Sequence, residues 1–273
     1  MWKKMNANPF RKSVPRKIIA ILMAGMVAMA IGIPMAMSSD QEAATTATVG
    51  NVAPVVTDAS VSPDPVTMSP CPNTTTITVT ATVSDDNGWG DITNVNVTIP
   101  SIVTDEPMTC TQSNATSGTC TVDIALNCCT PATTYTATVE AKDQAGATGT
   151  DTYTFTVSPT VDITVTDVNF GNVAPGGSST ASSTVTNNGN AEIKFVDAAP
   201  AGYDNPDDND GIYWSDMTSN GNTIVDDQIS TTWNSATTIS CGSSDDVPFT
   251  LDVPSGTPEG TYTGTITFSP SVA

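Results

Sequence analysis

The fold class is decided by one stretch of alternating residues, Thr76-Ile77-Thr78-Val79-Thr80-Ala81-Thr82-Val83. Every second residue is apolar and the residues between them are threonines, a period of two that is typical of a β-strand with one buried and one solvated face. The same alternation returns at residues 95–99, 135–141 and 153–157, and turn signals separate the runs at residues 86–88 and 143–146. The sequence therefore predicts an all-β protein.

The spacing of these runs predicts two domains. Residues 54–158 hold about seven runs, which is the size and strand spacing of an immunoglobulin-like (Ig-like) sandwich, and Tyr135 opens the run where such a sandwich places its tyrosine corner. A second set of runs starts at Val161 and ends with apolar residues alternating from Tyr262 to Phe268. We expect two Ig-like β-sandwich domains in tandem, at 54–158 and 159–273, after a linker at 40–53 and an N-terminal hydrophobic signal or anchor helix at 1–39.

Residues 1–39 carry the features of an export signal. Basic residues come first, an apolar run follows from Ile18 to Ile33, and small residues end the segment at Ala36 and Ser38. An uncleaved anchor is the first alternative, because about 20 apolar residues suffice to cross a bilayer. A pilin-type helix, cut before Ile18, is the second. All three place residues 40–273 in an extracellular or cell-surface location, with membrane contact only through an uncleaved N-terminal segment.

The charge balance excludes several classes of function. The 273 residues include 8 basic side chains, 28 acidic ones and no histidine. Beyond residue 39 only Lys142 and Lys194 remain against all 28 acids, a net charge of 2 − 28 = −26. Such a polyanion cannot neutralise phosphates, which excludes nucleic acid as a partner. Without histidine, Ser-His-Asp and Cys-His mechanisms and imidazole zinc sites are excluded as well, and we expect no enzyme.

Cysteine usage agrees with export. Six cysteines are present, none of them in the C-x-x-C spacing of metal and redox motifs, and an even number in an exported chain predicts disulfides. Cys110 and Cys120 flank a hairpin-like loop and are expected to pair. Cys128 and Cys129 are adjacent, so one of them, taken as Cys128, is expected to reach Cys71. The remaining cysteine either pairs with Cys241, which would join the two domains, or stays free.

Acidic loops suggest calcium as the one candidate ion, although no cofactor is required. Alternating oxygen ligands of the kind that Ca²⁺ prefers precede Gly211, namely Asp204, Asp207, Asp208 and Asp210. The stretch is no EF-hand, since Met217 stands where a bidentate glutamate is needed. A weaker candidate is formed by Asp85, Asp86 and Asp143, joined by Asp91, because their loops lie at the same pole of an Ig-like sandwich. Solvated acidic loops explain both groups without an ion.

Two surface features complete the candidates. Sequons for N-glycosylation occur at Asn73, Asn96 and Asn114, with Asn96 expected to face water. Three tryptophans, Trp89, Trp214 and Trp233, could form a sugar-binding platform, although a role in the core is the simpler explanation.

Several stretches resemble a known group of modules. The run from Thr78 to Gly88 and the run from Tyr135 to Val157 look like parts of the Ig-like and PKD-like modules of archaeal and bacterial surface proteins. In the second domain, residues 168–176 and 186–190 resemble modules of secreted archaeal proteins. The resemblance covers residues 54–273 and implies an architecture rather than a function, because such sandwiches carry many unrelated roles.

We therefore expect a non-catalytic secreted or cell-surface protein with a structural or adhesive role, whose partner is a surface protein, a glycan or a second copy. One alternative is a subunit of a filament or surface lattice, in which residues 45–56 add a strand to a neighbour's sheet. Another is a soluble calcium- or glycan-binding module with a concave site near Trp214 or the acidic loop before Gly211. An exported hydrolase would need a tight cluster of shielded carboxylates.

Overall fold

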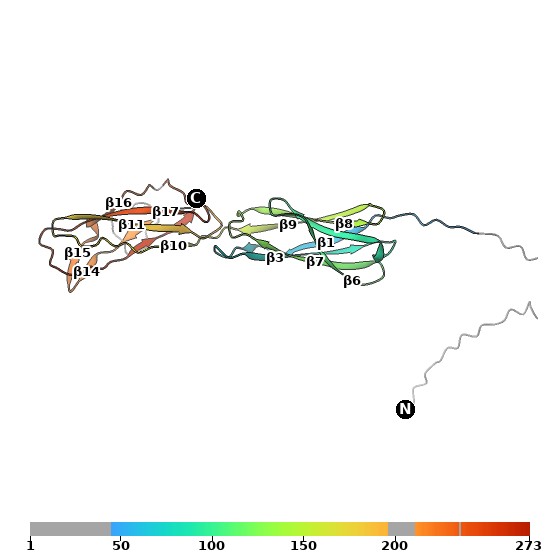
Figure 1. The fold of residues 1–273 in the computed structure, drawn as a ribbon, viewed down its shortest axis with the longest axis horizontal. Coiled ribbons are helices and arrows are strands. Elements are labelled where there is room, and N and C mark those ends of the chain that lie inside the picture. Colours follow the sequence, from blue (N-terminus) through green and yellow to red (C-terminus); the bar gives the residue numbers. More distant parts are fainter. Residues whose placement is uncertain (1–44, 196–210, 235) are drawn as a thin grey trace, which may run out of the picture. The chain divides into compact units, whose positions relative to one another are not determined.

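The computed structural model describes residues 45–195, 211–234 and 236–273 (Figure 1). Within these ranges the protein is all-β, as the alternation predicts, and the helical elements are two short 3-10 turns, η1 (Trp89–Asp91) and η2 (Asp226–Gln228). One compact unit runs from Gly50 to Ala273. No helix in the described ranges has the length and hydropathy needed to cross a bilayer. The signal or anchor expected at residues 1–39 lies outside the described residues.

Two β-sheets form the first half of this unit. One sheet has the order β1-β3-β7-β6, and the other has the order β2-β9-β8-β4-β5. Neighbours are antiparallel, except that β2 runs parallel to β9. The strands are β1 (Val55–Ser62), β2 (Val66–Thr67), β3 (Thr75–Ser84), β4 (Ile92–Ile99), β5 (Val103–Pro107), β6 (Thr109–Gln112), β7 (Ser117–Leu126), β8 (Thr134–Asp143) and β9 (Thr148–Ser158). These nine strands exceed the expected seven because β2 and β5 are short edge strands without a clear alternation.

The alternating residues pack as the period of two requires. In β3, Ile77, Val79, Ala81 and Val83 are fully buried, whereas the threonines between them are half-buried. The apolar residues of β4, β8 and β9 come from the opposite sheet and belong to the same hydrophobic core, which includes Phe155. The two sheets therefore enclose one core, and the polar threonines face away from it.

The second half has a less regular architecture. A four-stranded sheet has the order β10-β11-β17-β16, and three two-stranded pairs accompany it, β12 with β19, β13 with β18 and β14 with β15. The strands are β10 (Ile163–Val165), β11 (Ser178–Asn187), β12 (Ile193–Phe195), β13 (Ile212–Trp214), β14 (Met217–Ser219), β15 (Asn222–Ile224), β16 (Ile229–Thr231), β17 (Ser244–Asp252), β18 (Ile266–Phe268) and β19 (Pro270–Val272). A separate hydrophobic core lies here, with Phe195, Trp214 and Phe249 among its buried residues.

One predicted strand is shorter than its sequence pattern. Alternation predicts a strand from Tyr262 to Phe268, but β18 begins only at Ile266. The chain passes close to its neighbours at Gly264, where a Cβ would lie 3.0 Å from the Met217 side chain and 3.1 Å from the Ser215 carbonyl oxygen. Before the glycine, Thr263 pairs with Thr218 of β14 in an isolated bridge, and after it the ladder to β13 begins at Ile266, so the chain changes its partner strand here.

The two halves are joined by bonds of two kinds. The Cys129–Cys241 disulfide links them covalently. Beside it, the Cys71 amide donates to the Asn188 carbonyl over 2.9 Å. Asn190 is buried and donates from Nδ2 to the carbonyl oxygens of Thr130 and Ser158, both at 3.1 Å. The junction is therefore a packed and hydrogen-bonded contact.

Candidate functional site

Three aspartates meet at one end of the first half. One carboxylate oxygen from each of Asp85, Asp91 and Asp143 lies within 4.8 Å of the other two. Asp85 follows the last residue of β3, Asp91 ends η1, and Asp143 ends β8. Asp85 and Asp143 are each only 2% exposed, and Asp91 is half-buried. We call these three residues the acidic cluster.

Backbone hydrogen bonds hold the three loops together. The amide of Asp85 donates to the Thr116 carbonyl at 2.8 Å, and the amide of Gln144 donates to the Asp91 carbonyl at 2.9 Å. The Gln144 side chain adds a bond of 2.9 Å to the carbonyl of Gly90. The residues after β8 are thereby tied to η1, which brings Asp143 beside Asp91.

Trp89 fixes η1 against the neighbouring sheet. Its amide donates to the Ala115 carbonyl at 2.9 Å, and its ring packs over Gly118 of β7. A Cβ at Gly118 would lie only 2.5 Å from Cη2 of that ring, so this position admits no larger residue without movement of the ring. Trp89 thus has a packing role that positions Asp91.

The two buried carboxylates have different hydrogen-bond environments. In Asp85, Oδ1 accepts from the Asn87 amide at 2.7 Å, whereas Oδ2 is buried and has no hydrogen-bond partner among the described residues. In Asp143, Oδ1 accepts from the Ala147 amide at 2.7 Å and Oδ2 accepts from Nδ2 of Asn51 at 2.8 Å. The Asn51 side chain, followed by backbone amides of the turn, lowers the pKa of Asp143 below its usual value and outweighs the opposing effect of burial.

Asn51→Ala should therefore make the protein more sensitive to acid. Because the pKa of Asp143 is lower in the folded than in the unfolded state, its contribution to stability is present above the unfolded pKa, near 3.8, and is lost as pH falls through the folded pKa. Removing Asn51 raises the folded pKa, so the acid-unfolding midpoint should move to higher pH. Circular dichroism from about pH 2 to about pH 5, the range in which carboxyl groups titrate, measures the acid-unfolding midpoint. The exposed Asn94→Ala serves as control, and equal shifts in both variants would contradict the assignment.

The remaining predicted acidic residues do not join the cluster. Asp86 is exposed and is not a member, because it follows the inward-facing Asp85 and lies on the solvent side of the turn. The stronger candidate from the sequence, formed by Asp204, Asp207, Asp208 and Asp210, lies outside the described residues. Asn51 was missed by sequence reasoning, since nothing local connects it to a residue 92 positions away.

The three sequons differ in their surroundings. Asn73 is exposed, as is Asn114. The Asn114 side-chain oxygen accepts from the amides of Thr116 and Ser117, both at 2.9 Å, so its side chain is engaged in the β6–β7 turn. Asn96 is half-buried in β4 between β5 and β8, on the face opposite the buried Val95 and Val97. Glycosylation at these sites stays a prediction.

All six cysteines are in disulfides. The structure joins Cys110 to Cys120 and Cys71 to Cys128, the pairs expected from the sequence. It also joins Cys129 to Cys241, which is the interdomain alternative of the two left open. The Sγ of Cys71 lies 3.7 Å from that of Cys129 and 3.6 Å from that of Cys241, so two disulfides are in contact at the junction. Three disulfides indicate an oxidising environment.

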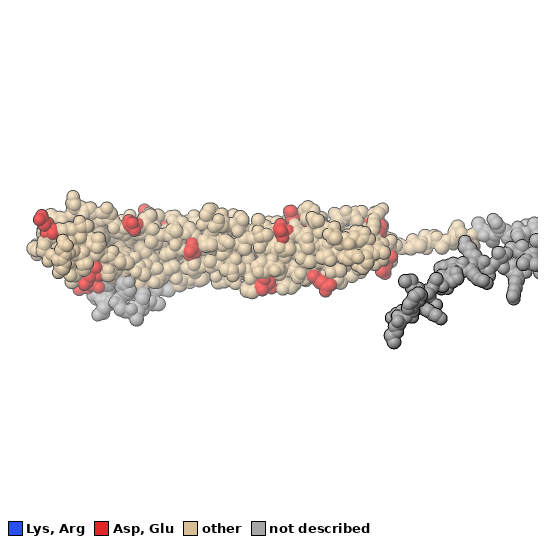
Figure 2. All heavy atoms as spheres, turned by 90° about the horizontal axis from the view of Figure 1, so that it is seen from below, with Lys and Arg blue, Asp and Glu red and all other residues tan. Residues whose placement is uncertain are grey.

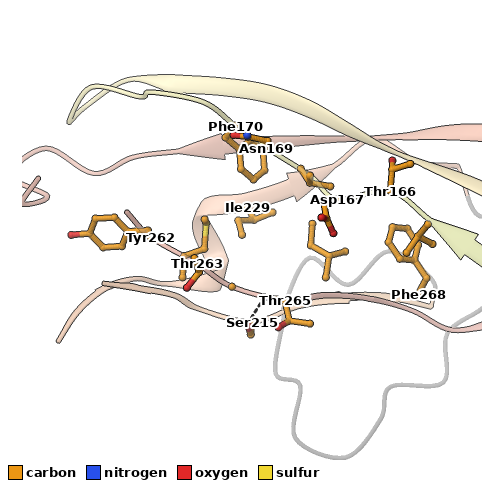
Figure 3. A pocket seen from close by; sticks show the side chains of 15 residues that line it. Thr166, Asp167, Asn169, Phe170, Ser215, Ile229, Tyr262, Thr263, Thr265 and Phe268 are labelled. Carbon is orange, nitrogen blue, oxygen red and sulfur yellow. Dashed lines mark hydrogen bonds between the residues drawn. The ribbon is translucent and has the colours of Figure 1, made fainter. Parts of the chain in front are cut away.

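A cavity of about 460 Å³ lies in the second half (Figure 3). Its lining mixes polar and apolar residues, with Thr166, Phe170 and Phe268 among the side chains drawn, and Ser215 Oγ accepts from the Thr265 amide at 3.0 Å on its wall. Asp167 is the one carboxylate in the lining. An adjoining cavity of about 690 Å³ shares Phe170 and Tyr262 with it. Neither cavity is lined by the acidic cluster.

Two of the three candidate tryptophans are not available as a sugar platform. Trp214 is 1% exposed and Trp233 is 6% exposed, and both belong to the second hydrophobic core. Trp214 packs edge-to-face on Phe249 and Trp233 packs edge-to-face on Phe195. The simpler explanation, a role in the core, holds for both.

Acidic side chains are spread over the surface as separate residues. On the face shown in Figure 2, carboxylates appear singly or in small groups, and no basic side chain of the described residues is visible there. On this face the carboxylates do not gather into one patch, and their spread suits solubility at high net charge.

Comparison with known proteins adds little to these observations. No family model matches the chain, and no curated protein matches it either. Among solved structures, the chain is similar to a protein of unknown function from Porphyromonas gingivalis W83, at 10% identity and a TM-score of 0.22, with 71% of this chain and 83% of that chain covered.

Proposed function

We propose that the chain is a non-catalytic, exported protein of the cell surface that acts as a structural or adhesive component built from Ig-like modules. Its partner would be a surface protein, a glycan or another copy. Export is supported by three disulfides, which indicate an oxidising environment. The structural role is supported by the way in which two of these disulfides close the chain into consecutive loops.

Two disulfides in series enclose residues 71–241 in two closed loops. Cys71 is bonded to Cys128, and the next residue, Cys129, is bonded to Cys241. A pulling force applied to the two ends would pass through Cys71–Cys128, one peptide bond and Cys129–Cys241. Every strand from β3 to β16 lies inside the two closed loops and is shielded from that force. This covalent path is the single observation that favours a structural role under mechanical load over the role of a soluble binding module.

An Ig-like architecture for the first half is supported by two features. The sheet orders β1-β3-β7-β6 and β9-β8-β4-β5 match the A-B-E-D and G-F-C-C′ arrangement of Ig-like sandwiches, with β2 as an extra edge strand. The Tyr135 hydroxyl donates to the Pro131 carbonyl at 3.0 Å, as a tyrosine corner does. Tyr262 makes the same bond, four residues back, to the carbonyl of Pro258 at 3.1 Å.

A hydrolase is less well supported by the same geometry. The acidic cluster is a set of shielded carboxylates, which is the feature that a hydrolase would need. General acid catalysis requires one carboxyl group whose pKa is raised so that it keeps its proton near neutral pH. The pKa of Asp143 is shifted in the opposite direction.

The location can be tested on the cells that make the protein. Antibodies raised against residues 45–273 should label intact cells as strongly as permeabilised ones. A cytoplasmic protein labelled in parallel should be seen only after permeabilisation. Labelling confined to permeabilised cells would contradict the proposed surface location.

A filament subunit remains a second candidate, favoured by the N-terminal segment of the described chain. Residues 45–54 belong to no strand, and Val49 is 84% exposed and Val52 45% exposed. Val55 and Val56, in contrast, already pair with β3. Residues 50–52 are held by hydrogen bonds to Asp143 and Asn87, so strand addition would use residues 45–49. Negative-stain microscopy of the purified protein tests this, because deletion of residues 45–50 should abolish any filaments.

A further inference from the structure

We infer that Asp85, Asp91 and Asp143 bind one calcium ion at the end of the first half. Two oxygens on the same Ca²⁺ can be at most about 5 Å apart, since each lies about 2.3–2.6 Å from the ion. The three carboxylate oxygens, within 4.8 Å of one another, satisfy this limit. The inference does not depend on the proposed surface role.

The buried and unpartnered oxygen of Asp85 points to a ligand. Buried polar atoms nearly always have a partner, and a carboxylate oxygen without one is especially unfavourable. Oδ2 of Asp85 is such an atom, on a side chain that is 2% exposed and whose other oxygen already accepts from the Asn87 amide. A cation coordinated by this oxygen would supply the missing interaction.

No basic side chain of the described residues neutralises the cluster. After residue 17 the sequence has only Lys142 and Lys194, and no arginine. Lys142 precedes Asp143 in β8, where neighbouring side chains point to opposite faces, and it is exposed whereas Asp143 is buried. The three carboxylates therefore repel one another without a compensating positive charge, and two of them are buried. A divalent cation would offset this repulsion and would give the unpartnered oxygen of Asp85 a ligand bond.

Calcium suits this site better than magnesium. The ligands come from three separate loops and their arrangement is irregular, which Ca²⁺ tolerates with six to eight oxygens, whereas Mg²⁺ demands a near-ideal octahedron. Both oxygens of Asp143 already accept one hydrogen bond, but each keeps a further lone pair for a metal. Backbone carbonyls and water would complete the shell.

The ion would also hold the segment before β1. Asn51 donates to Asp143, and Asn87, next to the cluster, donates to the Gly50 carbonyl at 3.1 Å and accepts from the Val52 amide at 2.7 Å. Because these asparagines are fixed by the loops that carry the ligands, calcium should stabilise residues 50–52 together with residues 85–91 and 143–147.

Hydrogen exchange on the full-length chain, kept in solution with a mild detergent, tests this inference. Extracellular calcium modules have dissociation constants of about 10⁻⁴–10⁻³ M, so about 10 mM CaCl₂ should slow exchange in peptides covering residues 85–91 and 143–147 by roughly 10- to 100-fold relative to chelator. The same concentration of MgCl₂ should have a smaller effect. Equal exchange with calcium and with chelator would overturn the inference.

Two matched variants separate a metal site from a structural cluster. Asp85→Asn should abolish the calcium effect, and in chelator its loops should exchange no faster than those of the wild type, because a buried charge has been removed. The neighbouring Asp86→Asn changes the same charge on an exposed side chain and should keep the full calcium effect. Retention of the effect in Asp85→Asn, or its loss in both variants, would refute the site. If Asp85→Asn does not fold, the half-buried Asp91→Asn is judged by the same criteria.

Discussion

Reducing the disulfides should lengthen the pulled protein by roughly 560–610 Å. The two closed loops span 57 and 112 residues, together 169, and an extended residue contributes about 3.3–3.6 Å. In the oxidised protein only the residues outside Cys71 to Cys241 can extend, because the force passes through the two disulfides. Single-molecule force spectroscopy, with and without reductant, measures the difference directly.

The double variant Cys129→Ser, Cys241→Ser tests the link between the two halves. It opens only the 112-residue loop, so the oxidised protein should gain roughly 370–400 Å. In the loop-entropy treatment, losing a crosslink over about 100 residues also costs about 4–5 kcal/mol of stability. The variant Cys110→Ser, Cys120→Ser is the control, since its ten-residue loop lies inside the sealed region and should leave the oxidised length unchanged. Unchanged length in the first variant would contradict the covalent path.

A single replacement at the junction should behave differently from the double one. Cys241→Ser leaves the Cys129 thiol with its Sγ 3.7 Å from the Sγ of Cys71 in the remaining disulfide. A thiolate at that distance can attack the disulfide and exchange partners. The double variant therefore gives the cleaner measurement, because it leaves no free thiol at the junction.

Phe155→Ala should destabilise the first half by about 3–5 kcal/mol, the usual cost of removing a fully buried phenylalanine from a core. Phe155 is fully buried in β9, and its ring stacks on Tyr135 with centroids 5.7 Å apart. The Tyr135 hydroxyl bond to Pro131 depends on that packing. Chemical denaturation gives the free energy of unfolding, and hydrogen exchange assigns the loss to one half.

The destabilisation by Phe155→Ala should be confined to the first half, because each half has its own hydrophobic core. Because the cores are separate, exchange should accelerate in β3, β8 and β9, while β17, which carries Phe249, stays protected. The exposed Thr154→Ala in the same strand is the control and should change stability by less than about 0.5 kcal/mol. Equal loss of protection in both halves would mean that they unfold as one cooperative unit.

The alternation of apolar and polar residues was enough to predict the regular strands of the first half. A period of two depends only on neighbouring residues, so the buried and exposed positions of β3 could be read from Thr76 to Val83. The same pattern failed between Tyr262 and Ile266, where Gly264 passes close to Ser215 and Met217 and the chain changes its partner from β14 to β13. That contact joins residues about fifty positions apart and has no local signature.

The sequence by itself determined the β class, the acidic surface and the pairing of Cys110 with Cys120, because these depend on composition, on period and on a short loop. It also indicated that Asp85 and Asp143 would share one pole. Only the tertiary structure decided that Asp91 and not Asp86 completes the cluster, that Asn51 bonds to Asp143, and that Cys129 closes the link to Cys241. Each of these outcomes depends on which distant loops meet, and that is set by packing of the whole chain rather than by neighbouring residues.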